Sequence, residues 1–225
     1  MTTSVIIPTK NEIIGIKKIL PQVDVTWADE WIVVDGNSTD GTIEEAKKLG
    51  FDVIQQKGDG LGDAYREAVK YATSENVLFF SPDGNAPPEY IPKLIKKMDE
   101  GDYDIVQISR FGKDGRSDDD TAVTAFGNRM FTFLVNSLFG GKLTDALFGF
   151  KIIKKKVFQE INLDGQFLTL EQQMSIKSMK LNLKIAEIDG IEPKRIGGEA
   201  KMQPLTTGKQ LSAQIIKEFI FWKIK

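Results

Sequence analysis

The sequence predicts an α/β fold in which helices cover both faces of a central sheet, giving three α/β/α layers. Short apolar runs alternate with segments of helical periodicity through the first third of the chain. These runs are continuous rather than alternating with polar residues, which is typical of parallel strands buried on both faces. Several of them end in Gly, Pro, Asp or Asn, which stop strands. Strict alternation of strand and helix indicates a doubly wound sheet with right-handed crossovers.

The N-terminal part contains strands and helices in regular alternation. We expect strands at residues 4–8, 31–34, 51–55 and 77–80. We expect the intervening helices at residues 13–20, 43–49 and 63–72. Turn-forming residues fill the loop before the second helix, and either Thr39 or Asp40 is suited to be its N-cap.

The remainder of the chain adds elements in a less regular order. Expected strands lie at 104–109, 152–153 and 185–188, and expected helices at 122–139 and 170–180. Loops are expected at 112–120 and 197–208, because both are rich in glycine and polar residues. We therefore expect a single domain with a mixed sheet over residues 1–208, followed by an amphipathic helix at 209–225.

That C-terminal helix has one apolar face and several basic side chains. Its apolar residues at helical spacing are Leu211, Ile215, Phe219 and Trp222, and its cations are Lys209, Lys217, Lys223 and Lys225. A basic amphipathic helix with aromatic residues can lie on a membrane surface. The alternative is that the helix packs onto this domain or onto a second copy in a homodimer.

Composition excludes several classes of function. The 225 residues include no cysteine and no histidine, which removes thiolate sites, Ser-His-Asp triads and most zinc sites. A net charge of −2 gives no overall attraction to nucleic acid. No signal peptide or membrane-spanning run is apparent, so we expect a cytoplasmic protein. The remaining catalytic resources are carboxylates, Lys, Arg, hydroxyl groups and a metal held by oxygen ligands.

Two acids follow expected strands at the edge where open α/β sheets bind ligands. Asp35 ends the second strand, and Asp83 follows the fourth, with Ser81 and Asn85 beside it. Oxygen ligands of this kind suit Mg²⁺ or Mn²⁺, and we expect the metal to hold a diphosphate. The alternative for each acid is a plain turn-forming role.

A glycine-rich turn precedes the third expected helix. Gly58, Gly60 and Gly62 follow Lys57, and backbone N–H groups at a helix start suit a phosphate or sugar-nucleotide contact. The spacing is not that of a dinucleotide-binding loop, and a plain strand-to-helix turn is the alternative.

Three segments in the N-terminal half resemble the nucleotide-sugar half of inverting family 2 glycosyltransferases with the GT-A, Rossmann-like fold. They are SVIIPTKNE at residues 4–12, IVVDGNSTDGT at 32–42 and SPDGNAPPE at 81–89. The resemblance implies contacts to the base and ribose of UDP or GDP from Pro8, Thr9, Asn11, Glu12 and Asp35. It also implies that Asp83 reaches the metal, with Asn85 standing where relatives often carry Gln.

The C-terminal half resembles the polyprenyl-phosphate hexose synthases of that family, the dolichyl-phosphate-mannose synthase type. The similar segments are SRF at 109–111, TDALFGFK at 144–151 and RIGGEAK at 195–201. The resemblance implies that Arg195 and Lys201 close over the diphosphate. It implies further that Arg110 and Arg129 hold the phosphate of a lipid acceptor, because guanidinium groups grip two phosphate oxygens at once.

The sequence departs from the family pattern at several positions. Ser81 stands where relatives carry the first acid of Asp-x-Asp, so one carboxylate replaces two and weaker metal binding is expected. Phe148 replaces a small Ser, and Lys151 replaces an Arg.

A hydroxyl acceptor needs a general base, which in relatives is an Asp near the position of Gln172. A glutamine cannot serve as that base, whereas a phosphate acceptor is already anionic and needs none. This favours a polyprenyl phosphate acceptor. The alternatives are a hydroxyl acceptor on a glycan, a nucleotide-sugar-binding module without turnover, and a nucleotidyltransferase, which typically has a longer glycine-rich loop after its first strand.

Overall fold

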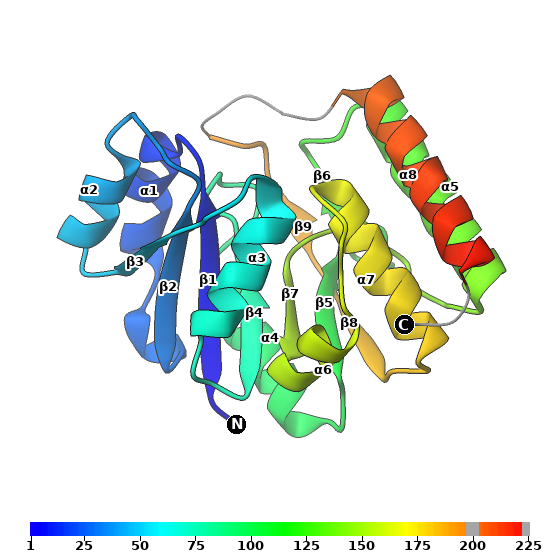
Figure 1. Ribbon diagram of the computed structural model, residues 1–225, viewed down its shortest axis with the longest axis horizontal. Coiled ribbons are helices and arrows are strands. Elements are labelled where there is room, and N and C mark those ends of the chain that lie inside the picture. Colours follow the sequence, from blue (N-terminus) through cyan, green and yellow to red (C-terminus); the bar gives the residue numbers. More distant parts are fainter. Residues whose placement is uncertain (197–202, 222–225) are drawn as a thin grey trace.

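The computed structural model describes residues 1–196 and 203–221. They form a mixed seven-stranded sheet with helices on both faces, as predicted (Figure 1). The strand order is β3-β2-β1-β4-β7-β5-β8. The strands are β1 (Thr3–Thr9), β2 (Glu30–Asp35), β3 (Asp52–Gln55), β4 (Asn76–Phe79), β5 (Ile105–Ser109), β7 (Lys151–Lys154) and β8 (Ile185–Asp189).

Strand β7 makes the sheet mixed, because it lies antiparallel between β4 and β5. Its register pairs Phe79 with Lys151 and Gln107 with Lys151. The other pairings in this sheet, β1 with β2 and β4, β2 with β3, and β5 with β8, are parallel. The carboxyl ends of β1, β2, β3 and β4 therefore meet at one edge.

Eight α-helices surround the sheet in the described part of the chain. They are α1 (Ile13–Ile19), α2 (Thr42–Lys48), α3 (Gly60–Tyr71), α4 (Tyr90–Glu100), α5 (Ala122–Phe139), α6 (Lys155–Glu160), α7 (Leu168–Lys180) and α8 (Pro204–Ile220). No described helix has the length and apolar character needed to cross a membrane.

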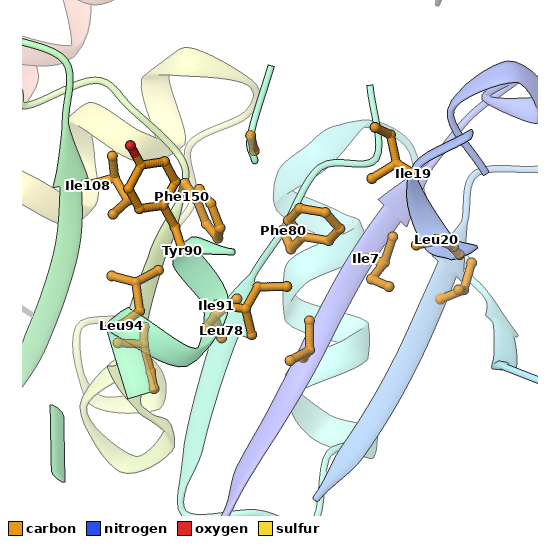
Figure 2. Packing of buried hydrophobic residues seen from close by; sticks show 14 of the residues in the cluster. Ile7, Ile19, Leu20, Leu78, Phe80, Tyr90, Ile91, Leu94, Ile108 and Phe150 are labelled. Atoms are coloured by element: carbon orange, nitrogen blue, oxygen red, sulfur yellow. The ribbon is translucent and has the colours of Figure 1, made fainter. Parts of the chain in front are cut away.

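Adjacent residues of the central strands bury their side chains on opposite faces of the sheet. Ile7 and Phe80 belong to a core with α1 and α4, whereas Ile6 and Phe79 belong to a core with α3, α6 and α7. Figure 2 shows the first core, where Phe80 and Phe150 lie between the helices and the sheet. In the second core the ring of Tyr65 stacks on Phe79 with centroids 3.9 Å apart. This two-sided burial explains the continuous apolar runs.

A third core joins α5, α7 and α8 beyond the edge of the sheet (Figure 1). Leu211 and Ile215 of α8 pack there against Phe131 and Val135 of α5, so one face of the C-terminal helix packs onto its own domain. Helix α8 starts at Pro204, ahead of residue 209, and Trp222 lies outside the described residues.

Three local features differ from the sequence-based expectation. The N-cap of α2 is Gly41, which has a φ of 91°, and not Thr39 or Asp40. Helices α4 and α6 were not predicted, although Ile91, Leu94 and Met98 of α4 follow helical spacing and are fully buried. The expected loop at 112–120 contains β6 (Arg116–Ser117), which pairs in parallel with β9 (Ile191–Glu192).

Candidate functional site

Asp35 is held by neutral donors at the carboxyl end of β2. It is fully buried, and Thr9 lies opposite it in the β1–β2 register. The Thr9 hydroxyl donates to Asp35 Oδ2 at 2.7 Å, and the Ser38 hydroxyl donates to the same oxygen at 2.7 Å. The Ser38 backbone N–H donates to Asp35 Oδ1 at 2.7 Å. The Asp35 carboxylate thus connects the end of β1 to the loop after β2, in addition to its role in the turn.

The turn after β1 is locked to the loop after β2. Asn11 has a φ of 56°, a left-handed conformation that asparagine tolerates better than most residues. Its backbone N–H donates to the Ser38 hydroxyl at 2.8 Å, and its side-chain oxygen accepts from Thr39 N–H at 2.9 Å. The Glu12 backbone N–H donates to the Thr42 hydroxyl at 2.9 Å. The two predicted nucleotide-binding loops therefore form one rigid surface.

Asp40 explains why the predicted N-cap was wrong. Its carboxylate accepts from Ile13 N–H at 3.1 Å and Thr42 N–H at 3.1 Å, so it bridges α1 and α2. Gly41 then supplies the left-handed turn into α2. Burial would raise the pKa of Asp40, but these hydrogen bonds and that of the Thr42 hydroxyl hold it below its ordinary value.

The glycine-rich loop uses some of its N–H groups within the protein. Gly58 N–H donates to Asp63 at 2.8 Å, and Gly62 N–H donates to Gln166 Oε1 at 2.9 Å. Gly60 opens α3 with a φ of 81°, and a side chain there would come within 2.8 Å of Gln166. Lys57 is exposed beside the loop. The loop thus anchors the segment that precedes α7, which the sequence did not indicate.

The Asp83 loop lies against α1 and is shaped by two glycines. A Cβ atom at Gly15 would come within 2.3 Å of the Pro82 carbonyl oxygen, so only glycine fits where α1 contacts the loop. Gly84 has a φ of 89°, and a Cβ there would meet Ile196 at 2.6 Å. Asp83 and Asn85 are both buried, and Asn85 N–H donates to Asp83 Oδ1 at 3.2 Å.

Arg195 is the cation that faces Asp83. Its guanidinium lies 3.4 Å from Asp83 Oδ2 and 3.6 Å from Asp119 Oδ2, so it bridges the β4 loop and the segment before α5. Burial raises the pKa of Asp83, although Arg195, the Asn85 N–H and the Ser81 hydroxyl act in the opposite direction. Lys201, the other residue expected over the diphosphate, lies outside the described residues.

The donor set at this loop fits a divalent metal that is shared with substrate. Asp83 supplies a carboxylate, and Ser81 and Asn85 supply neutral oxygens, all acceptable to Mg²⁺ or Mn²⁺. Among the described residues, no three acids cluster as a metal-binding group. Asp83 would be the single carboxylate that these three residues offer to such a metal.

Arg110, expected at the acceptor phosphate, is buried in a network with two acids. Its Nε donates to Asp145 Oδ2 at 2.7 Å and its Nη2 donates to Asp145 Oδ1 at 3.1 Å. Its Nη1 donates to Glu192 Oε2 at 3.2 Å. Burial disfavours the charged guanidinium, but Asp145 and Glu192 raise the pKa of Arg110 above its ordinary value. Sequence reasoning assigned no role to either acid.

A cavity of about 270 Å³ opens next to this network, between β6 and the start of α5. Arg110, Arg116 and Arg129 all line it, as do Ala122 and Ala125 of α5 and the acid Asp120. The Arg129 guanidinium lies 5.1 Å from the ring centroid of Phe111. Asp120 is the neighbour of Asp119, which contacts Arg195. The cavity is thus linked through Arg195 to Asp83.

A second buried ion pair lies beside Gln172. Lys151 Nζ lies 2.9 Å from Glu171 Oε2, and both side chains are almost fully buried. Burial raises the pKa of Glu171, and the attraction of Lys151 opposes this only in part. Gln172 beside it is fully buried and cannot ionise. Sequence reasoning missed the pair because its members come from β7 and α7.

The fold is the GT-A fold of nucleotide-sugar-dependent transferases. One similar solved structure is glucosyl-3-phosphoglycerate synthase from Mycobacterium tuberculosis, crystallised with Mn²⁺, UDP and glucosyl-3-phosphoglycerate. It superposes with a TM-score of 0.74 at 22% sequence identity. The match covers 96% of this chain and 79% of that one. The family model for glycosyl transferase family 2 matches residues 4–162. The chain belongs to glycosyl transferase family 2.

Curated relatives are similar over nearly the whole chain. A dolichyl-phosphate hexose transferase of Haloferax volcanii is 28% identical over 216 residues, covering 95% of this chain and 92% of that protein. The glycosyltransferase AglJ of the same organism is 28% identical over 206 residues, covering 91% of this chain and 67% of that protein.

Proposed function

We propose that the protein transfers a hexose from UDP- or GDP-hexose to a polyprenyl phosphate, with inversion at the anomeric carbon. The observation that carries this proposal is the cavity lined by Arg110, Arg116 and Arg129, which Arg195 and Asp119 connect to the Asp83 loop. A donor diphosphate at Asp83 and an acceptor phosphate in the cavity would then share one edge of the sheet. Similarity to a dolichyl-phosphate hexose transferase supports the same acceptor class.

The nucleotide would lie on the locked surface between the β1 and β2 loops. Pro8, Thr9, Asn11, Glu12 and Asp35 line or organise that surface, and the hydrogen bonds described above fix it before any ligand arrives. Such preorganisation reduces the entropy lost on binding. Lys57 and Gly60 border the same edge and would contact the sugar or the phosphates.

Asp83, with Ser81 and Asn85, would hold Mg²⁺ or Mn²⁺ against the diphosphate. A divalent cation there supplies charge stabilisation to the departing nucleoside diphosphate. The neighbour crystallised with Mn²⁺ and UDP is consistent with this assignment. Arg195, already 3.4 Å from Asp83, would add a guanidinium to the same leaving group, and Lys201 is expected beside it.

The acceptor phosphate would react without a general base. One of its oxygens forms the new bond to the anomeric carbon, while the bond to the diphosphate oxygen breaks and that oxygen keeps the electron pair. No proton has to be removed from an anionic phosphate. Glu171 is paired with Lys151 and Gln172 is neutral, so this half of the site suits such an acceptor better than a hydroxyl.

Within the cavity, the Arg129 guanidinium lies over the ring of Phe111, whereas that of Arg116 pairs with Asp118 at 3.1 Å. Arg110 directs its guanidinium to Asp145 and Glu192, which positions it at the cavity wall. We therefore assign direct phosphate binding to Arg129, and to Arg110 the role of shaping the cavity wall from its pairs with Asp145 and Glu192. Catalysis then comes mainly from orientation and from stabilising the leaving group.

The test is a product assay on the full chain. UDP- and GDP-hexoses are incubated with Mn²⁺ or Mg²⁺ and a short polyprenyl phosphate, and the products are weighed by mass spectrometry. We expect a species equal to polyprenyl phosphate plus one hexose, and none from the polyprenol of equal length. Arg129→Gln should lose this product while still binding the nucleotide. A hexose found only on the polyprenol or on a glycan hydroxyl would overturn the proposal.

A further inference from the structure

The outer surfaces of α5 and α8 expose large apolar side chains. We name as the apolar face Val123, Phe126 and Phe133 of α5 with Leu205, Ile216 and Ile220 of α8. Phe126 and Phe133 are 69% and 68% exposed, and Leu205 is 84% exposed. The two helices stand together at the edge of the molecule beyond β8 (Figure 1). Several large apolar side chains exposed on two helices that pack together indicate an interaction site.

The apolar face is a built feature of two well-anchored helices. Helix α5 begins with a reciprocal capping box between Thr121 and Thr124. Its inward residues join the core shared with α7 and α8. Phe126 and Phe133 are seven positions apart, so they project from the same side of the helix. Their exposure is therefore not the result of a frayed end.

The charges on these helices favour an anionic surface. Glu218 is the sole carboxylate within the described parts of α5 and α8, and it is buried and paired with Lys180 at 2.7 Å. The cations are Arg129 and Lys209, both exposed, and Lys217, which contacts Asp164 at 2.6 Å. Apolar side chains with cations and no exposed carboxylate match the headgroup region of an acidic bilayer.

We propose that the apolar face docks on the surface of an anionic lipid bilayer, with α5 and α8 lying in the interface. The choice of a bilayer over a second copy rests in part on the proposed function. Ala122 and Ala125 line the acceptor cavity, and Val123 and Phe126 are their immediate neighbours on α5. A second copy seated on those residues would cover the mouth of the cavity, whereas a bilayer there presents lipid phosphates to it.

The test is co-sedimentation of the full chain with lipid vesicles. Vesicles of phosphatidylcholine with phosphatidylglycerol are compared with phosphatidylcholine alone. We expect the protein to bind the acidic vesicles, and we expect its binding to the neutral vesicles to be several-fold weaker. The double variant F126E/F133E should reduce the partition coefficient at least about tenfold, because two carboxylates must enter the headgroup region.

A matched control carries the same two charges elsewhere. Val25 and Tyr71 are 57% and 52% exposed and lie outside the core that α5 shares with α7 and α8, so V25E/Y71E should bind vesicles within about twofold of wild type. Should F126E/F133E unfold, the milder F126S/F133S replaces it and should still lose binding severalfold. Equal vesicle binding by wild type and the folded variant would overturn the proposal.

Two further outcomes separate the alternatives. A wild-type dimer that F126E/F133E converts to a monomer, without vesicle binding by either, would show that a second copy occupies the face and would overturn the proposal. Transfer to detergent-solubilised polyprenyl phosphate is measured on the same proteins. Vesicle binding without transfer supports the docking surface and refutes the function, whereas transfer without vesicle binding refutes the docking surface alone.

Discussion

The nucleotide edge and the acceptor side of this protein manage buried charge in opposite ways. At the nucleotide edge, Asp35 is fully buried yet receives only neutral donors, from Thr9 and Ser38. On the acceptor side, Arg110 is surrounded by Asp145 and Glu192, and Lys151 faces Glu171. Asp35 thus holds the loops after β1 and β2 without a cation, and Asp83 at the same edge faces one partly exposed cation, Arg195. The Arg110 network buries one cation with two acids and forms a wall that ties distant segments together.

The comparison predicts that Asp83 governs chemistry and not folding. Asp83→Ala should lower diphosphate release at least ~1000-fold, about 4 kcal/mol in transition-state free energy, because it removes the sole carboxylate of the proposed metal site. The melting temperature should change little. Release is followed with a coupled nucleoside-diphosphate assay, and Asp83→Asn is the isosteric control, which should be nearly as inactive. Full activity of Asp83→Ala would place the metal elsewhere.

Arg110 should show the reverse, a large effect on stability. Arg110→Met leaves Asp145 and Glu192 buried without their cation, which should cost about 3 kcal/mol. For a chain of this size the melting temperature should fall by roughly 10 °C. Calorimetry measures the change, with Arg116→Met as control, because Arg116 is exposed and pairs with Asp118 at the surface. Similar melting temperatures for the two variants would contradict the wall-like role.

Asp35 tests whether neutral donors suffice to hold a buried carboxylate. In Asp35→Asn the charge is lost, and an amide N–H₂ replaces one of the two oxygens that accept from Thr9 and Ser38. The weaker hydrogen bonds should loosen the loops proposed to contact the nucleotide and lower its affinity ~10-fold, about 1.4 kcal/mol, by titration calorimetry. Asp40→Asn, which disturbs a partly exposed bridge in the same loop, should weaken binding less.

Ser81 should have the smallest effect. Its hydroxyl lies next to Asp83 in the loop but carries no charge, so Ser81→Ala should lower turnover only ~2–3-fold. Ser81→Asp restores the second acid of the family pattern and should lower the Mn²⁺ concentration needed for half-maximal activity. An unchanged metal requirement in Ser81→Asp would show that residue 81 does not reach the metal.

Local patterns in the sequence predicted much of this structure. The helix at 122–139 matches α5 residue for residue, because Thr121 caps its start and Gly140 ends it in a left-handed turn. The strands were found because continuous apolar runs follow directly from burial on both faces. Asp35 and Asp83 were placed on one edge because parallel strands end together.

Features that depend on distant partners were not predictable. Glu192 contacts Arg110 across 82 positions of sequence, and no spacing rule connects them. Lys151 and Glu171 meet only because β7 and α7 pack together. The apolar face was only partly predictable. The sequence indicated an amphipathic C-terminal helix, but its predicted apolar residues Leu211 and Ile215 pack inward. Helix α5 has apolar residues around most of its circumference, so its sequence did not indicate which side is exposed.

The central position of β7 has a consequence for how the chain folds. Strand β4 pairs with β1 on one side and with β7 on the other. Because β7 (Lys151–Lys154) is synthesised long after β4, β4 lacks this second partner during most of synthesis. Until then the nucleotide-binding strands present an open apolar edge, which is prone to aggregation. The contact between β4 and β7 is also non-local, which slows folding. A fragment that stops before β7 should therefore be insoluble, and the two halves of the site must mature as one unit.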